Sequence, residues 1–268
     1  MLRIDNLKLP IGADEEALRL SCAHALRVEA ERLTSVKLLR RSIDAREGVR
    51  LVCAAAVAVE NESAILKRCK NKNVQPYAPV HYAPPAPVNA PERSPVVIGA
   101  GPAGLFCALL LARCGAKPIL LERGRAVEQR KRDVAHFWRT GELDLSSNVQ
   151  FGEGGAGAFS DGKLNTGTKD VRHGYILEEL VRFGASGDIL VDAKPHVGTD
   201  GLYAVLQNLR RELLEAGGEI RFSHTVVDIG CSGGSVAALR VSSPEGEYTL
   251  PAHHVVLAPG HSARDTFA

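Results

Sequence analysis

The stretch VVIGAGPAGLFCALLLARCGAKPILLE, residues 96–122, decides the fold of most of this chain. Val96 to Ile98 predict a short buried strand, and Leu105 to Cys114 predict an apolar helix. Ile119 to Leu121 predict the next strand, which ends at Glu122. Strand, glycine-rich turn, helix, second strand and acid follow one another within about thirty residues, which is the order required of a dinucleotide-binding βαβ unit. We therefore expect an α/β, Rossmann-like domain.

The turn of this unit, GAGPAG at residues 99–104, is a G-x-G-x-x-G run in which each glycine has a different structural role. The first permits a tight turn, the second lets the backbone approach a pyrophosphate, and the third lets helix and strand pack closely. The helix then points its free N–H groups and positive dipole end at the phosphates. Glu122 can accept hydrogen bonds from an adenosine ribose. The predicted cofactor-binding residues are Gly99, Gly101, Pro102, Ala103, Gly104 and Glu122.

The same turn has a plainer interpretation, a glycine-rich connection between strand and helix that binds nothing. The complete order of strand, turn, helix, strand and acid favours the cofactor site over that interpretation. An acid at the end of the second strand disfavours the 2′-phosphate of NADP. FAD and NAD both stay open on this motif alone.

Proline divides the chain into two domains. Residues 75–95, QPYAPVHYAPPAPVNAPERSP, lack many backbone donors and favour a semi-rigid, extended linker. Residues 1–74 predict a small α+β domain with the order β-α-β-β-α, which suggests a ferredoxin-like sandwich. Its expected elements are strands at 2–9, 36–42 and 49–59, a helix after Asp14, and a helix at 62–70. Residues 96–268 are expected to form the nucleotide-binding domain.

The composition, with 45% hydrophobic and 24% charged residues and a formal net charge of +2, is that of a soluble globular protein. Its longest apolar runs, Leu51–Val59 and Gly104–Ala112, are too short to span a bilayer. The basic residues of the first domain are interleaved with acids and lack stacking aromatics, which favours a solvated surface over nucleic-acid binding. The six cysteines form no C-x-x-C pair, so we expect reduced, mostly buried thiols and a cytoplasmic protein.

Several motifs resemble those of the bacterial FAD-dependent dehydrogenases of largely unassigned substrate, within the glutathione-reductase-type flavoproteins. They are SIDAR at 42–46, IGAGPAGLF at 98–106, LERG at 121–124, SNVQFGEGGAGAFSDGKLNT at 147–166, GTDGL at 198–202 and APGHSARDTF at 258–267. The run at 147–166 is specific, whereas the G-x-G-x-x-G is shared with very many proteins. The resemblance implies a FAD-dependent oxidoreductase, with NAD(P)H as a further candidate electron donor.

The resemblance also implies further contacts with FAD. Two arginines would lie near the diphosphate or adenine, although a solvated surface of the helix at 126–140 is the alternative for the second of them. A glycine-dense loop would lie against the cofactor, with an ordinary surface loop as its alternative. The backbone of a later strand would meet the adenine, and the strand at 254–258 would end close to FAD. These residues are Arg123, Arg130, Gly154, Gly155, Ala156, Gly157, Val226, Ala258, Pro259 and Gly260.

The later part of the chain is expected to complete this architecture. Thr199 or Asp200 can cap a helix that runs to about Ala216. Strands are predicted at 219–222, 225–229, 236–241 and 248–250, as in a β-meander. The run GCSGG at 230–234 matches the letters of a nucleophile elbow, but it lies between two predicted strands and is interpreted as a hairpin turn.

Two features depart from the family's pattern. Pro259 replaces the middle residue of the A-T-G with which the family's strand ends. The family's late Gly-Asp motif has no counterpart, because Gly187-Asp188 comes too early. We therefore expect a chain truncated after its first half, which would hold the adenosine half of the FAD site, lack a C-terminal half and bind FAD weakly by itself.

No residue qualifies as a catalytic acid or base on the sequence alone, and the substrate is not identified. His196 and His261 are the best candidates, although a single histidine is more often structural. His253 and His254 are adjacent in a strand and point to opposite faces, so we expect no metal site. Two alternatives remain open: an NAD-dependent dehydrogenase, and a non-enzymatic nucleotide- or RNA-binding module.

Overall fold

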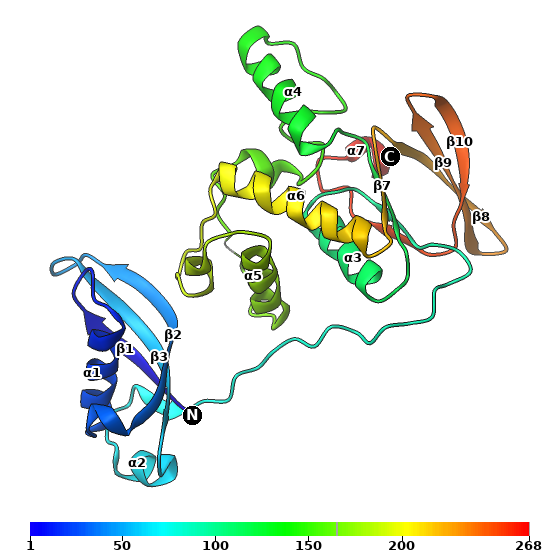
Figure 1. Cartoon of the computed structure of the whole chain (residues 1–268). Coiled ribbons are helices and arrows are strands. Elements are labelled where there is room, and N and C mark those ends of the chain that lie inside the picture. The colour runs from blue at the N-terminus through cyan, green and yellow to red at the C-terminus, as the bar shows by residue number, and fades with distance from the viewer. Residues whose placement is uncertain (165, 268) are drawn as a thin grey trace. The chain divides into compact units, whose positions relative to one another are not determined.

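The computed structural model describes residues 1–164 and 166–267, so Asn165 of the longest motif and the terminal Ala268 lie outside it. The chain separates into two compact units (Figure 1). The first comprises residues 1–82, 163–181 and 186–196, and the second comprises residues 83–162, 182–185 and 197–268. The first unit is therefore discontinuous in sequence, a grouping that local sequence patterns do not predict.

The first unit is built on an antiparallel sheet with the strand order β2-β3-β1-β4. Its elements are β1 (Leu2–Leu9), α1 (Glu15–Leu26), η1 (Ala30–Arg32), β2 (Leu33–Asp44), β3 (Arg50–Val59), α2 (Glu62–Arg68) and β4 (Val74–Pro76). The order β-α-β-β-α is the one predicted, followed by an additional strand. Gln75 and Pro76, which the sequence analysis gives to the linker, pair with β1 instead. Proline is tolerated there because an edge strand can do without one N–H donor.

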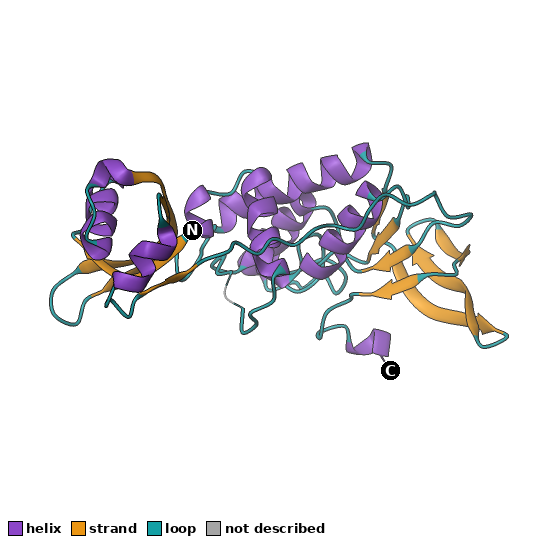
Figure 2. Ribbon diagram, turned by 90° about the horizontal axis from the view of Figure 1, so that it is seen from below, coloured by secondary structure: helices purple, strands orange, loops and turns teal. Residues whose placement is uncertain are grey.

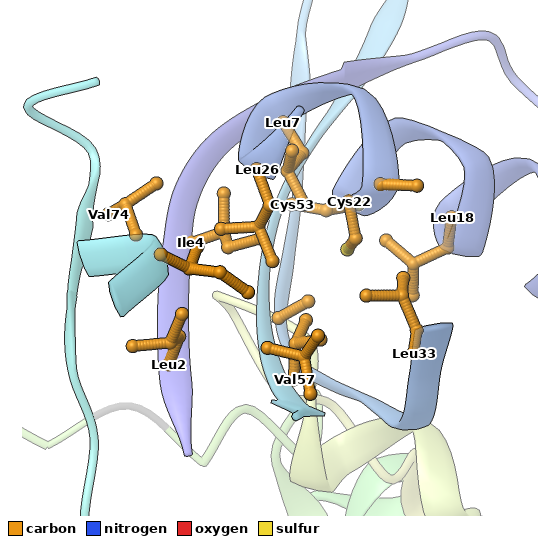
Figure 3. Close-up of a cluster of buried hydrophobic side chains, with 14 of the residues drawn as sticks. Leu2, Ile4, Leu7, Leu18, Cys22, Leu26, Leu33, Cys53, Val57 and Val74 are labelled. Carbon is orange, nitrogen blue, oxygen red and sulfur yellow. The ribbon is translucent and has the colours of Figure 1, made fainter. Parts of the chain in front are cut away.

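Helices α1 and α2 pack on one hydrophobic core (Figure 3). Asp14 caps α1 as predicted, because its carboxylate accepts the Ala17 N–H at 2.9 Å. Leu18, Cys22 and Leu26 of α1 then face the buried side chains of the sheet. Each fully buried leucine contributes about 1.5–3 kcal/mol, so this face of α1 is the main force that holds the helix on the sheet.

A segment from the middle of the chain joins this sheet at the edge strand β2. The Arg41 N–H donates to the Val191 carbonyl at 2.7 Å, and the Ala193 N–H donates to the Arg41 carbonyl at 2.8 Å. The Arg41 guanidinium also forms ion pairs with Asp188 at 2.9 Å and Asp192 at 2.8 Å. Residues 186–196 therefore pair with the edge strand at Arg41, where the backbone groups would otherwise be unpaired. Helix α5 (Arg172–Arg182) and the short turn η3 (Gly187–Leu190) belong to the same part of the chain.

The second unit contains the predicted βαβ unit in a parallel sheet with the order β11-β5-β6-β7. Helix α3 packs against this sheet and against α6 (Figures 1 and 2). The elements before the meander are β5 (Val96–Ile98), α3 (Pro102–Arg113), β6 (Ile119–Glu122), α4 (Val127–Thr140), η2 (Ala156–Phe159), α6 (Thr199–Glu215) and β7 (Glu219–Phe222). None of the described helices is long and apolar enough to cross a membrane.

The meander forms a separate antiparallel sheet, β10-β9-β8 (Figure 2). It is followed by the strand that returns to the parallel sheet. These elements are β8 (Thr225–Ser232), β9 (Ser235–Ser243), β10 (Gly246–Pro251), β11 (Val255–Leu257) and α7 (Arg264–Phe267). Gly233 and Gly234 have φ values of +58° and +79°, so the glycine-rich run is the predicted hairpin turn. A buried cluster that includes Ile98, Leu121 and Leu239 joins the two sheets.

The start of helix α6 differs from the sequence prediction. The residue that precedes the helix is Gly198, and no side chain caps the first turn. Thr199 and Asp200 lie inside the helix instead. Gly198 has a φ of +78°, a left-handed conformation that glycine adopts without strain. The left-handed backbone conformation of Gly198 therefore sets where the helix begins, and a capping side chain does not set it.

Candidate functional site

A cavity of about 450 Å³ lies within the second unit, at the carboxyl ends of β5, β6 and β11. Ligands of open α/β sheets bind at this end of the strands. Most of the predicted cofactor residues line it, namely Gly99, Gly101, Pro102, Ala103, Glu122, Arg123, Gly155, Ala156, Val226, Ala258, Pro259 and Gly260. Segments that are far apart in the sequence thus converge on one concave site.

The three glycines of the turn differ in what surrounds them. A Cβ at Gly99 would lie 2.3 Å from the Ala258 carbonyl oxygen, and one at Gly104 would lie 1.8 Å from the Gly99 carbonyl oxygen. Both positions exclude any side chain because backbone packs against them. A Cβ at Gly101 would meet no other described residue within 4 Å, apart from its two neighbours in sequence, although Gly101 lines the cavity. Glycine at position 101 thus keeps open a space that the fold itself does not fill.

Helix α3 points its N-terminus at this open space. Pro102 stands in the first helical turn, where its missing N–H costs nothing, and no side chain caps the helix. The first N–H groups of a helix have no partner within the helix, and the macrodipole adds a partial positive charge there. This end of α3 is therefore suited to an anionic group such as a diphosphate.

Glu122 connects the two glycine-rich loops that border the cavity. One carboxylate oxygen accepts the Ala100 N–H at 2.6 Å, and the other accepts the N–H groups of Gly124 at 2.9 Å and Gly152 at 3.0 Å. Three of roughly four acceptor positions of the carboxylate are thus used by backbone. The predicted acceptor for a ribose thus mainly holds the two loops together, with about one acceptor position left, and Glu122 lines the cavity.

Arg123 lines the cavity but is held by the segment that follows β11. Its guanidinium forms a two-pronged ion pair with Asp265, at 2.9 and 3.1 Å, and donates to the Thr266 hydroxyl at 2.9 Å. It also lies 4.5 Å from the centre of the Phe151 ring. The hydrogen bond from Arg123 lowers the pKa of the Asp265 carboxyl below its ordinary value. The ion pair is exposed on the Asp265 side and can open at little cost.

Arg130 lies away from the cavity wall and inside the protein. It is fully buried, and its donors reach the carbonyl oxygens of Asn148 at 2.8 Å, Val149 at 2.9 Å and Glu153 at 2.7 Å. Burial lowers the pKa of this guanidinium to about 10. Arg130 therefore does not line the cavity, and its burial rules out the alternative of a solvated helix surface. Arg130 instead fixes the loop that carries the second run of glycines.

Three other predicted residues do not line the cavity, and two of them act through packing. Gly104 lies against the Gly99 backbone, and a Cβ at Gly154 would meet Leu206 at 2.5 Å. The Gly154 N–H donates to the Ala100 carbonyl at 2.8 Å, which ties the second glycine loop to the first. Gly157 faces open space at the start of η2.

Glu153, which the sequence analysis did not single out, is a fully buried carboxylate behind the glycine loop. One oxygen accepts the Val127 N–H at 2.8 Å and pairs with Arg210 at 2.9 Å. Its other oxygen has no hydrogen-bond partner among the described residues. Burial raises the pKa of Glu153 to about 7, against the lowering effects of Val127 and Arg210. No sequence signal could have shown this, because a glutamate between glycines normally lies in an exposed turn.

Several further residues of the cavity wall also escaped prediction. They are Gln150, Phe151, Gly152, His224, Thr225, Ser262 and Thr266, together with the strand ends Ile98 and Leu257. Ser262 donates to the Gln150 side chain at 3.1 Å, which places the segment after β11 against the second glycine loop. Of the two candidate histidines, His261 lines the cavity, whereas His196 forms an isolated β-bridge with Lys163 in the first unit.

Residues 93–265 match the protein family described as "FAD binding domain". The chain belongs to this family. Residues 1–60 match a second family, described only as a domain of unknown function. An uncharacterized protein of Clostridium beijerinckii is 38% identical over 270 residues, which cover 99% of this chain and 50% of that protein. The chain thus spans about half the length of this curated relative.

Similar solved structures include the THI4 protein of Thermovibrio ammonificans, with 18% identity and a TM-score of 0.42. That match covers 63% of this chain and 58% of the other. The anhydrotetracycline hydroxylase OxyS of Streptomyces rimosus has 23% identity and a TM-score of 0.35, over 63% of this chain and 32% of the other. Because these TM-scores are low, the function proposed below depends on the cavity and on the family match.

Proposed function

We propose that the cavity of the second unit binds FAD, and that the chain is part of a FAD-dependent oxidoreductase of still unidentified substrate. The observation that carries this proposal is the open space at Gly101, on the cavity wall and at the uncapped N-terminus of α3. A diphosphate needs a close backbone, free N–H groups and room for its oxygens. All three occur together at this position, so the residues present fit the cofactor.

The remaining wall supplies the rest of the binding site. Gly101 and Ala103 would face the diphosphate, and the spare acceptor position of Glu122 would serve a ribose hydroxyl. Gly155 would bring the second glycine loop close to the cofactor, because a Cβ there would lie 3.2 Å from the Gly101 Cα. Val226 and Pro259 offer apolar or backbone surface toward the flat rings. When bound, the flavin would accept or donate a hydride or electrons, and the protein would supply orientation and electrostatics.

The chain is shorter than its curated relative, and this difference concerns how much of the flavin-binding site the chain supplies. The curated relative is about twice as long as the aligned region. We propose that residues 93–265 supply the adenosine and diphosphate part of the site, and that a second half like the relative's, in cis or in trans, completes the flavin environment. Adding that half should raise flavin occupancy, and unchanged occupancy would contradict this part of the proposal.

The test is a visible absorption spectrum of the purified chain, taken before and after incubation with FAD and removal of free cofactor. Retained flavin bands support the proposal. A chain that takes up no FAD but binds NAD, followed by fluorescence of the reduced nucleotide, would favour the NAD-dependent dehydrogenase instead. The same titration with the chain joined to the second half of its relative separates weak binding from no binding.

A further inference from the structure

One of the cavities in the first unit has a strongly basic wall. It has a volume of about 620 Å³ and lies at the C-terminal ends of α1 and α2. These helices pack on the same hydrophobic core, so their ends lie side by side (Figure 1). His24, Arg27, Arg68 and Lys70 line the cavity, and no described residue on its wall is an aspartate or glutamate. The site is therefore concave and of one charge sign.

None of these four basic side chains forms an ion pair or a hydrogen bond with a described residue. Other arginines of the same unit behave differently, because Arg3, Arg46 and Arg50 each pair with an acid close in sequence. The four side chains are exposed, or border the cavity, without a partner that would neutralise them. Their charge is thus available to an anion that enters the cavity.

A simpler explanation is that basic residues favour the negative ends of helices. The helix ends are already satisfied by backbone, however. The Arg27 N–H donates to the carbonyls of Ala23 and His24, and the Cys69 N–H donates to the Ile65 carbonyl. Moreover, Arg27 has a φ of +55°, a left-handed conformation in which glycine is the usual residue. An arginine there costs backbone strain that glycine would avoid, and it brings a guanidinium to the cavity.

The chemistry of the wall restricts the ligand. Guanidinium groups bind phosphate oxygens in a two-pronged geometry, and several cations together favour a multiply charged anion. The volume lies within the range of about 300–1,000 Å³ that is typical of small-molecule sites. No phenylalanine, tyrosine or tryptophan of the described chain lines the cavity, so it lacks the large stacking rings that single-stranded nucleic acid uses.

We propose that this cavity binds the diphosphate group of a small molecule, independently of the FAD site in the second unit. Free pyrophosphate and the diphosphate end of a nucleotide share the recognised chemistry. Arg68 and Lys70 flank Cys69 and, together with Arg27 at the end of α1, provide the charges that hold the anion.

The experiment is a calorimetric titration of the full chain with pyrophosphate. Excess FAD is present so that the cavity at the N-terminus of α3 is occupied. The double variant Arg68→Glu/Lys70→Glu should weaken binding by at least about tenfold. The control, Lys37→Glu/Arg40→Glu, makes the same change in net charge on β2, away from this cavity, and should stay within about twofold of the wild type. An Arg68→Gln/Lys70→Gln variant gives the same comparison without charge reversal, in case reversal disturbs folding.

A titration with ADP distinguishes the two sources of the anion. Tighter binding of ADP than of pyrophosphate indicates a nucleotide, and equal binding indicates the free diphosphate; both support the site. Three results would overturn it: no uptake of pyrophosphate or ADP by the wild type, equal weakening by both double variants, or binding of a twenty-nucleotide RNA only.

Discussion

At the scale of single residues, two buried glutamates carry most of the organisation around the cavity that we propose binds FAD. Glu122 holds both glycine loops through three backbone N–H groups, and Glu153 anchors the start of α4 and pairs with Arg210. Their environments differ. Glu122 accepts three backbone N–H groups, whereas Glu153 keeps one buried oxygen without a partner in the described chain. We therefore expect the two side chains to respond in opposite ways to loss of charge.

Replacing Glu122 by glutamine should destabilise the second unit by about 2–4 kcal/mol, because an amide NH₂ would face backbone N–H donors that need an acceptor. Urea denaturation measures this loss. Glu142→Gln is the matched control, since Glu142 is 78% exposed and pairs only with His136; its effect should stay within about 0.5 kcal/mol. Equal denaturation midpoints for the two variants would show that Glu122 does not hold the loops.

Glu153 should make stability depend on pH in the direction opposite to an ordinary ion-paired carboxylate. Burial raises its folded-state pKa from 4.5 to about 7, so the folded protein holds this proton over a range in which the unfolded chain has lost it. The contribution to the free energy of unfolding therefore falls as pH rises from about 4.5 to 7, and then levels off. Denaturation at several pH values should show that the wild type loses stability over this window relative to Glu153→Gln. A constant difference between the two proteins would refute the assignment.

At the scale of elements, the cavity is bordered by two loops whose conformations are fixed by buried polar contacts. The turn after β5 and the loop at 147–156 are joined by the Gly154 N–H and the Ala100 carbonyl, and Arg130 holds the second of them from α4. A glycine-dense loop would otherwise be costly to order, because glycine loses more conformational freedom than other residues. The buried guanidinium thus preorganises the loop before any ligand enters.

Replacing Arg130 by methionine should leave several buried carbonyl groups without donors, lower the free energy of unfolding by about 3 kcal/mol and loosen residues 148–155. Hydrogen exchange followed by mass spectrometry would show faster exchange in that loop. Arg132→Met, at an exposed position of the same helix, should leave the exchange unchanged. If both variants exchange alike, the loop is ordered by something other than Arg130.

At the scale of the whole molecule, the first unit is completed by residues that lie between parts of the second unit in sequence. Arg41 makes this connection, through the backbone of Val191 and Ala193 and through Asp188 and Asp192. The rings of Tyr82 and Tyr175 add an edge-to-face contact at 5.2 Å. The first unit is thus connected to the rest of the chain through residues 163–181 and 186–196 as well as through the proline-rich linker.

Replacing Arg41 by alanine should release residues 186–196 from β2, because both ion pairs are lost and the bridging strand keeps only two backbone bonds. Limited proteolysis should then cut within this segment at least about threefold faster than in the wild type. Arg40→Ala, on the same strand and with an exposed side chain, should be cut at the wild-type rate. Equal rates in all three proteins would show that Arg41 does not fix the segment.

The sequence predicted those features that local patterns encode. The βαβ unit, the hairpin turn at 233–234, the capped helix α1 and the part of the cavity wall between Gly99 and Glu122 follow from glycine spacing, apolar periodicity and a capping aspartate. The other predicted residues of the wall depended on the resemblance to a known family. The roles of Arg130, Glu122 and Glu153 could not be predicted, since each depends on contacts with carbonyls or N–H groups about twenty or more residues away. The attachment of 186–196 to β2 is likewise a long-range pairing that leaves no local signal.

The central claim is that the space at Gly101 holds the diphosphate of FAD. Its most direct test is the dissociation constant for FAD, measured by fluorescence titration of the wild type and of Gly101→Val and Gly174→Ala. Gly174 is also surrounded by open space, but it lies in α5 of the first unit. We predict that Gly101→Val keeps the thermal stability of the wild type and binds FAD about a hundredfold more weakly or worse. Gly174→Ala should bind FAD as the wild type does. Wild-type affinity in Gly101→Val would contradict the account.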